Sequence, residues 1–209
     1  ESALHSFCHA LPGLWHQMGV ILSATDALNW LAGVLQEDAQ TLTSDLGSLQ
    51  VPSRTVFMPY LGGERTPHND AQIRAGFLHL GHTTDRNAMV RAVLEGVTHA
   101  LRDSFDAMAM TGTKIDSLMA VGGGSKSDYW LQAIATSLDM PIQLPAAGDF
   151  GAALGAARLG RMAATGEGAE IAVPPPVSRV IEPDSKLVPA FADAHARYSE
   201  TYRAIKSLR

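Results

Sequence analysis

The sequence predicts an α/β fold in which a mixed or parallel β-sheet is covered by helices. Short apolar runs alternate with helix-like segments along most of the 209 residues, which is typical of βαβ units. A strand–helix–strand pattern over residues 115–145 gives the clearest such unit. The chain is 46% hydrophobic and only 18% charged, a balance that suits a globular domain with surface to bury against a neighbour.

The first 80 residues contain short elements separated by turns. We expect a strand at 2–10, a helix within 15–34, a short polar helix within 36–50, and two strands of one layer at 56–61 and 74–80 around a polar loop at 62–70. Ser23 or Thr25 is a candidate N-cap for the first helix. The chain begins in the middle of a strand pattern, so we expect a fragment of a longer protein.

The strongest helix signal covers residues 85–110. Its apolar side chains recur every three or four residues and form one stripe, namely Val90, Val93, Leu94, Val97, Leu101, Phe105 and Met108. Thr84 is the expected N-cap, and Gly112 is the expected stop. This helix should supply much of the core.

The second half completes the pattern. A strand at 115–121, a helix at 127–138 and a strand at 141–145 form the βαβ unit. An alanine- and glycine-rich helix at 151–165 follows, for which Asp149 is the expected cap. Three prolines at 174–176 predict an extended connector, and an amphipathic helix at 187–208 ends the chain.

Composition excludes several functions. A net charge of −5 argues against nucleic acid as a partner. Apolar runs fall short of the roughly 18 residues of a membrane span, so we expect no membrane partner. Cys8 is the single cysteine, which suits the reducing cytoplasm, and we expect it to be a buried, inert thiol. The eight histidines lack ligand spacing, so we assign no metal ligand.

Three consecutive glycines, Gly122, Gly123 and Gly124, lie between the strand and the helix of the βαβ unit. Such a turn exposes unpaired N–H groups and lets a flat ligand approach the backbone. The spacing excludes a P-loop, because Lys126 does not follow the last glycine, and a dinucleotide fingerprint, because Ser127 replaces the third glycine. Alone, these glycines favour a plain strand-to-helix turn over a nucleotide site.

Several motifs together resemble one family. The loop at 58–70 contains P-Y-L-G-G-E-R-T-P-H. The segment at 5–30 precedes it, and the segments at 91–97, 122–127 and 148–157 follow it, in matching order. They resemble the carbohydrate kinases named for their F-G-G-Y motif, and among these the xylulokinases. One position departs from the family pattern: His79 stands where the family has glycine, which puts the local loop geometry in question.

The resemblance implies a fold like that of actin and hexokinase, with two ribonuclease H-like domains and ATP and Mg²⁺ in the cleft between them. Residues 1–209 would be a partial C-terminal domain. The N-terminal domain that mostly holds D-xylulose, and the catalytic aspartate, would lie upstream of residue 1. The whole protein would phosphorylate D-xylulose, as a homodimer, whereas the fragment would be inactive and would self-associate. The alternatives are another sugar kinase (a ribulokinase, a gluconokinase or a glycerol kinase-like enzyme) or a non-catalytic nucleotide-binding or scaffold module.

The same resemblance assigns the candidate nucleotide contacts. Gly122, Gly123 and Gly124 would form the wall beside adenine and ribose, and Ser127, Thr25 and Asn29 would add polar contacts. Other residues have two readings. Glu64 and Arg65 either line the cleft or form an internal ion pair, and Asp149 either lies near the phosphates or only caps a helix.

Overall fold

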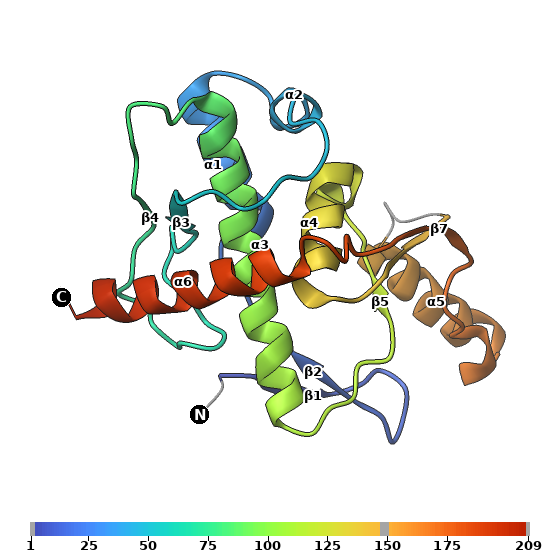
Figure 1. Cartoon of the computed structure of the whole chain (residues 1–209). Coiled ribbons are helices and arrows are strands. Elements are labelled where there is room, and N and C mark those ends of the chain that lie inside the picture. Colours follow the sequence, from blue (N-terminus) through green and yellow to red (C-terminus); the bar gives the residue numbers. More distant parts are fainter. Residues whose placement is uncertain (1–2, 147–150, 208–209) are drawn as a thin grey trace.

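The long helix α3 (Arg86–Met110) forms the centre of the molecule. The computed structural model describes residues 3–146 and 151–207. Helix α6 (Val188–Lys206) crosses α3, and α4 (Asp128–Leu138) lies beside α3 (Figure 1). The predicted apolar stripe explains the central position of α3, because it lets this helix pack against several elements at once.

The strands of the described residues form three small sheets. Strands β1 (His5–Cys8) and β2 (Trp15–Met18) are antiparallel, as are β3 (Val56–Met58) and β4 (Gly76–Leu78). In the third sheet, β5 (Leu118–Met119) runs parallel to β6 (Ile142–Pro145), and β7 (Val177–Ile181) is antiparallel to β6. The predicted mixed α/β fold and the βαβ unit are therefore confirmed.

The core lies between α3 and the N-terminal helices α1 (Ala24–Leu35) and α2 (Ala39–Ser44). Its fully buried side chains include Leu31, Leu42, Val93, Leu94 and Val97. Strand β3 reaches the same helix at Gly96, where an added Cβ would lie 2.2 Å from the carbonyl oxygen of Phe57. Only glycine permits this approach.

One expectation about a helix and one about a helix cap were wrong, and one strand was missed. Trp15–Met18 is a strand paired with β1 rather than the start of a helix, and the strand β7 was not predicted at all. The N-cap of α3 is Asp85, whose carboxylate accepts a hydrogen bond from Ala88 N–H at 2.7 Å. Thr84 instead accepts one from Gly81 N–H through Oγ1 at 2.9 Å.

The prediction that Cys8 is buried was also wrong, because its side chain is exposed. The β1–β2 hairpin carries other exposed apolar residues, including Phe7 at 44% and Trp15 at 69% of their full exposure. No other described element covers these side chains, so their apolar character did not lead to burial.

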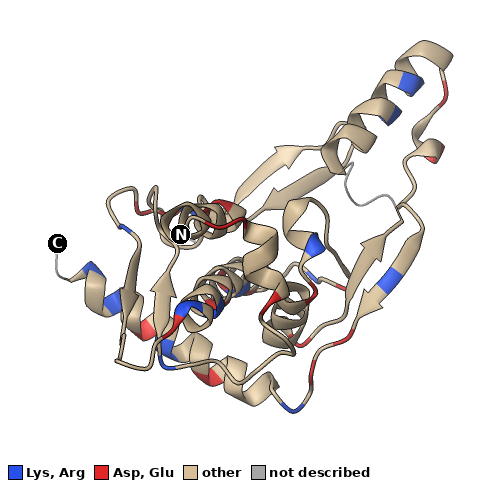
Figure 2. Ribbon diagram, turned by 90° about the horizontal axis from the view of Figure 1, so that it is seen from above, with Lys and Arg blue, Asp and Glu red and all other residues tan. Residues whose placement is uncertain are grey.

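Helix α5 (Gly151–Thr165) projects from the body of the molecule (Figure 2). Among the described residues of this helix, none is buried. A short 3₁₀ helix, η3 (Ala169–Ile171), follows it. Asp149, the expected cap, lies outside the described residues.

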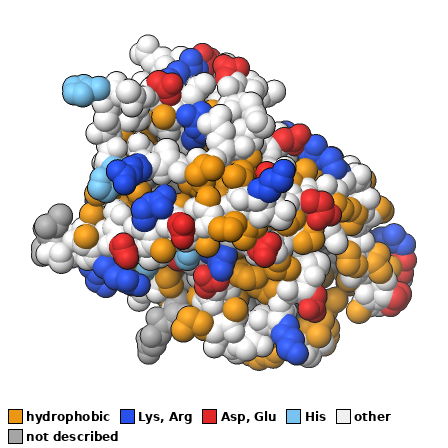
Figure 3. Space-filling view, in the orientation of Figure 1, with side chains coloured by type: hydrophobic (Ala, Val, Ile, Leu, Met, Phe, Trp, Pro, Cys, Tyr) orange, Lys and Arg blue, Asp and Glu red, His pale blue; other side chains and the backbone are white. Residues whose placement is uncertain are grey.

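On the face of the molecule drawn in Figure 3, acidic and basic side chains are interspersed among apolar ones. Across the described part of the chain, no helix combines the length and the hydrophobicity needed to cross a bilayer.

His79 follows strand β4 and has a φ of 60°. This is the left-handed region that glycine adopts at little cost and other residues rarely adopt. The position at which this chain departs from the family pattern therefore has a backbone conformation that suits glycine.

Candidate functional site

The triple glycine forms a turn of its own between β5 and α4. Gly122 has a φ of 86°, and Gly123–Lys126 form the 3₁₀ helix η1. Ser125 closes the turn, because its N–H and its Oγ–H both donate to Gly122 O, at 3.1 and 2.6 Å. The sequence suggested that the glycines lead directly into α4. Instead, the left-handed φ of Gly122 begins a tighter turn, and η1 lies between this turn and α4.

A groove of about 550 Å³ opens beside this turn. Elements far apart in the sequence surround it: the start of α1, the C-terminal half of α3, β5, η1 and α4. Among the described residues that line it, none carries a charged side chain; they include Gly19, Thr25, Val97, Leu101, Ser104, Phe105, Met108, Gly122, Gly123, Gly124, Ser125 and Trp130. The groove is thus apolar, with a few hydroxyl groups.

Gly124 is the tightest point of the glycine wall. An added Cβ there would lie 3.2 Å from Cζ3 of Trp130 and 3.5 Å from Oγ1 of Thr25. At Gly122 and Gly123, no described atom lies within 4 Å of such a Cβ. The turn therefore presents bare backbone toward open space at two positions and packs closely at the third.

The structure brings four of the six candidate contacts together. Gly122, Gly123, Gly124 and Thr25 all line the groove. Ser127 and Asn29 are not among the described residues that do so. Ser127 is the N-cap of α4, where its Oγ accepts a hydrogen bond from Trp130 N–H at 3.3 Å, and Asn29 is exposed one turn after Thr25 on α1.

Ser104 lines the groove and was missed by the sequence analysis. Its Oγ is buried and has no hydrogen-bond partner among the described residues. A buried hydroxyl without a partner is unfavourable, and Gly19 packs against this one, since a Cβ added at Gly19 would lie 3.0 Å from Ser104 Oγ. The signal in the sequence was a serine next to the apolar stripe of α3, directly before Phe105.

Glu64 and Arg65 do not form the expected internal ion pair. The Glu64 carboxylate accepts hydrogen bonds from the backbone N–H groups of Leu22 and Arg65, at 3.1 and 2.8 Å. The Arg65 guanidinium donates to Oδ1 of Asn69 at 3.4 Å instead. The carboxylate is therefore held by backbone donors rather than by the neighbouring charge.

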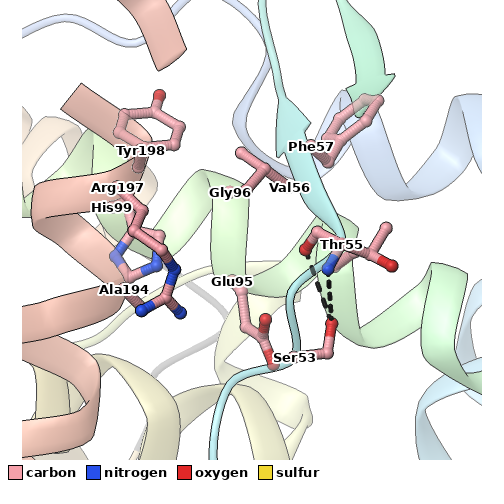
Figure 4. A pocket seen from close by; sticks show the side chains of 11 residues that line it. Ser53, Thr55, Val56, Phe57, Glu95, Gly96, His99, Ala194, Arg197 and Tyr198 are labelled. Carbon is pink, nitrogen blue, oxygen red and sulfur yellow. Dashed lines mark hydrogen bonds between the residues drawn. The ribbon is translucent and has the colours of Figure 1, made fainter. Parts of the chain in front are cut away.

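A second pocket, of about 10 Å³, lies between β3, α3 and α6 (Figure 4). Glu95, His99 and Arg197 line it. Burial raises the pKa of the Glu95 carboxyl to about 8 and lowers the pKa of His99 to about 3. Its volume is that of a single water molecule, so the pocket belongs to the core and is not a ligand site.

The described residues offer no site for a metal. Among them, no group of three or more His, Cys, Asp or Glu side chains could hold an ion, and the lining of the groove is uncharged. The residues of the groove therefore do not fit Mg²⁺ as a directly bound ligand.

The chain is similar to sugar kinases along its length. The model of the FGGY family of carbohydrate kinases, C-terminal domain, matches residues 2–164. The xylulose kinase of Escherichia coli (strain K12) is 38% identical over 212 residues, which cover 100% of this chain and 44% of that protein. The xylulose kinase of Klebsiella pneumoniae is 36% identical over 218 residues, with the same coverage.

Solved structures of sugar kinases are also similar to this chain. A crystal structure of a xyloylose (xylulose) kinase from Brucella ovis has a TM-score of 0.94 and 54% identity, covering 100% of this chain and 44% of that one. A ligand-bound xylulose kinase from Lactobacillus acidophilus has a TM-score of 0.82 and 28% identity, covering 96% and 42%. These likenesses confirm the predicted actin- and hexokinase-like fold. The chain spans less than half the length of the curated relatives it matches, 44% of each.

Proposed function

The chain belongs to the FGGY family of carbohydrate kinases, and we propose that it is the nucleotide-binding C-terminal part of a kinase that acts on D-xylulose. The whole protein would transfer the γ-phosphoryl group of ATP to D-xylulose and release D-xylulose 5-phosphate. The observation that carries the nucleotide part is the uncharged groove beside the triple glycine. The relatives named xylulose kinase support the choice of sugar.

The groove suits a base and a ribose better than a chain of phosphates. A flat wall at Gly122 and Gly123 accepts the face of an aromatic ring, because no Cβ intervenes. The hydroxyl group of Thr25 supplies a polar contact. Ser127 and Asn29 remain proposed contacts outside the groove.

Phosphoryl transfer depends on positioning and on stabilisation of charge. In this chain, the proposed role is to hold the nucleotide and to exclude water from one face of its base. The base that accepts the sugar hydroxyl proton is expected in a preceding segment, and Mg²⁺ would neutralise phosphate charge without ligands from the groove. A homodimeric whole protein in the cytoplasm also remains a prediction.

Isothermal titration of the 209-residue chain with ATP tests the nucleotide site. We expect binding by the parent chain and at least tenfold weaker binding by Gly124→Val, because the added side chain would press on Trp130 and Thr25. Gly160→Val on α5 is the matched control, since no described atom lies within 4 Å of its added Cβ. Equal affinities for Gly124→Val and the parent would contradict the proposed site, and a parent that binds no ATP would favour the scaffold alternative.

The sugar is tested in the longer protein that contains this chain. We expect faster phosphorylation of D-xylulose than of ribulose, gluconate or glycerol, measured as ATP consumed. A different order would assign the protein to another kinase of the same family. The structural likeness to a gluconate kinase from Lactobacillus acidophilus, with 27% identity and a TM-score of 0.80, makes gluconate the sharpest comparison.

A further inference from the structure

The loop at residues 62–70, which we name the bracing loop, is hydrogen-bonded to the segment 19–23 that leads into α1. Val20 N–H donates to Oγ1 of Thr66 at 2.9 Å, and Thr66 N–H donates back to Val20 O at 3.0 Å. Leu22 N–H donates to Oε1 of Glu64 at 3.1 Å. These side-chain bonds join residues 46 and 42 positions apart, so a distant loop fixes the path of the segment.

The two side chains that make these bonds are buried. Thr66 is 0% and Glu64 is 2% exposed. Burial raises the pKa of the Glu64 carboxyl to about 7, and its Oε2 has no hydrogen-bond partner among the described residues. A carboxyl group keeps an acceptor oxygen whether or not it is protonated, so the bond from Leu22 survives both states.

The bracing loop is anchored on its other side by α6. Glu64 and Asp70 exchange two backbone hydrogen bonds, at 2.9 and 2.8 Å. Oδ2 of Asp70 accepts a hydrogen bond from the hydroxyl of Tyr202 at 3.2 Å, and its Oδ1 accepts one from Ile73 N–H at 3.1 Å. The loop therefore transmits the position of α6 to segment 19–23.

The braced segment leads to the groove. Gly19 at its start and Thr25 just beyond its end both line the groove. Ser23 is the N-cap of α1, yet in the described part of the chain its side chain makes no capping hydrogen bond. The direction of the first turn of α1 therefore depends on the residues before it, and this turn places Thr25 Oγ1 beside Gly124.

We propose that Glu64 and Thr66 are positioning residues that set the geometry of the nucleotide site by fixing segment 19–23, which leads to Thr25. The inference rests on the proposed function for its ligand. Neither residue touches the groove, so both act through the backbone of the segment they hold.

The test compares variants that remove the bonds with variants that keep them. Glu64→Ala and Thr66→Val remove an acceptor, whereas Glu64→Gln and Thr66→Ser retain one. Phe191→Leu, a buried change on α6, controls for a general loss of stability. We expect ATP affinity, measured by calorimetry on folded protein, to fall about tenfold in the first pair and to stay within twofold of the parent in the other three.

Amide hydrogen exchange of residues 19–28 gives a readout without nucleotide. We expect at least tenfold faster exchange there in Glu64→Ala and Thr66→Val, and no local change in Phe191→Leu. Unchanged ATP affinity in the first pair, or an equal loss in Phe191→Leu, overturns the inference. A parent chain that does not bind ATP overturns the proposed function instead, and unchanged exchange in Glu64→Ala then overturns the bracing as well.

Discussion

Helices α3 and α5 are both regular, but they differ in length and in how deeply their residues are buried. Helix α3 has 25 residues, of which twelve are buried, including Glu95, His99 and Ser104. Helix α5 has 15 residues, and none of those described is buried. Because neighbours surround α3 on several sides, each of its positions is constrained by a specific contact. We therefore expect the same type of substitution, glycine to alanine, to have opposite effects on stability in the two helices.

The largest expected effect is at Gly96 of α3. Gly96→Ala would place a Cβ 2.2 Å from the Phe57 carbonyl oxygen, and backbone cannot move aside as a flexible side chain can. We expect the free energy of unfolding to fall by about 3 kcal/mol or more, measured by urea denaturation. Gly33→Ala on α1 is the control, because no described atom lies within 4 Å of its added Cβ. A loss below about 1 kcal/mol would show that β3 can shift away from α3.

The next effect is the pH dependence that α3 imposes. The folded-state pKa of Glu95, about 8, lies above its value of 4.5 in the unfolded chain, so stability is lost as the pH rises from about 4.5 to 8. The folded-state pKa of His99, about 3, lies below its unfolded value of 6.5, so stability is lost as the pH falls from about 6.5 to 3. The two windows overlap between pH 4.5 and 6.5, where the opposed slopes offset each other and stability changes little, so the losses are expected above about pH 6.5 and below about pH 4.5. Each loss is on the order of a few kcal/mol.

Two variants separate these slopes. Glu95→Gln should flatten most of the alkaline loss, with the remainder due to Glu64, whose pKa is raised to about 7. His99→Gln should flatten the acid loss. Denaturation at pH values from 4 to 9 measures both, and a parental alkaline slope in Glu95→Gln would contradict the assignment.

A smaller effect is expected at Ser104, the buried hydroxyl on the groove side of α3. Ser104→Ala removes an oxygen that has no hydrogen-bond partner among the described residues. We expect stability to be unchanged or raised by up to about 1 kcal/mol, measured by thermal denaturation. A clear loss of stability would show that the hydroxyl has a partner such as a bound water, and Ser104→Thr would then retain it.

The smallest effect is at Gly155 of α5. No described atom lies within 4 Å of a Cβ added there, so only helix propensity changes. Gly155→Ala should raise stability by about 0.5–1 kcal/mol if α5 unfolds together with the body. An unchanged midpoint of unfolding, with slower amide exchange confined to α5, would show that this helix unfolds independently of α3.

Much of the fold could be predicted from local patterns. Helix α3 was found because its apolar stripe spans many turns, and β3 and β4 were found as two short apolar runs expected in one layer. Strands β2 and β7 were not found, because each depends on its partner: β2 is exposed along its length, and β7 pairs with β6 from across α5.

The candidate site was predicted in part for the same reason. Gly122, Gly123 and Gly124 are recognisable as a run, and Thr25 came from the family pattern. Ser104 and the bracing by Glu64 depend on contacts between distant segments, which spacing along the chain does not reveal. The N-cap of α3 shows a narrower limit, since Thr84 and Asp85 are adjacent and only geometry distinguishes them.

The loop after strand β4 has a glycine-like backbone at His79, a residue that carries a side chain. Its left-handed backbone is held by strand β4 before it and by the Gly81–Thr84 turn after it, where Thr84 N–H donates to Gly81 O at 3.0 Å. These neighbours flank a residue whose side chain disfavours its own backbone angle. A glycine at this position would remove that local cost without any change in the path of the loop.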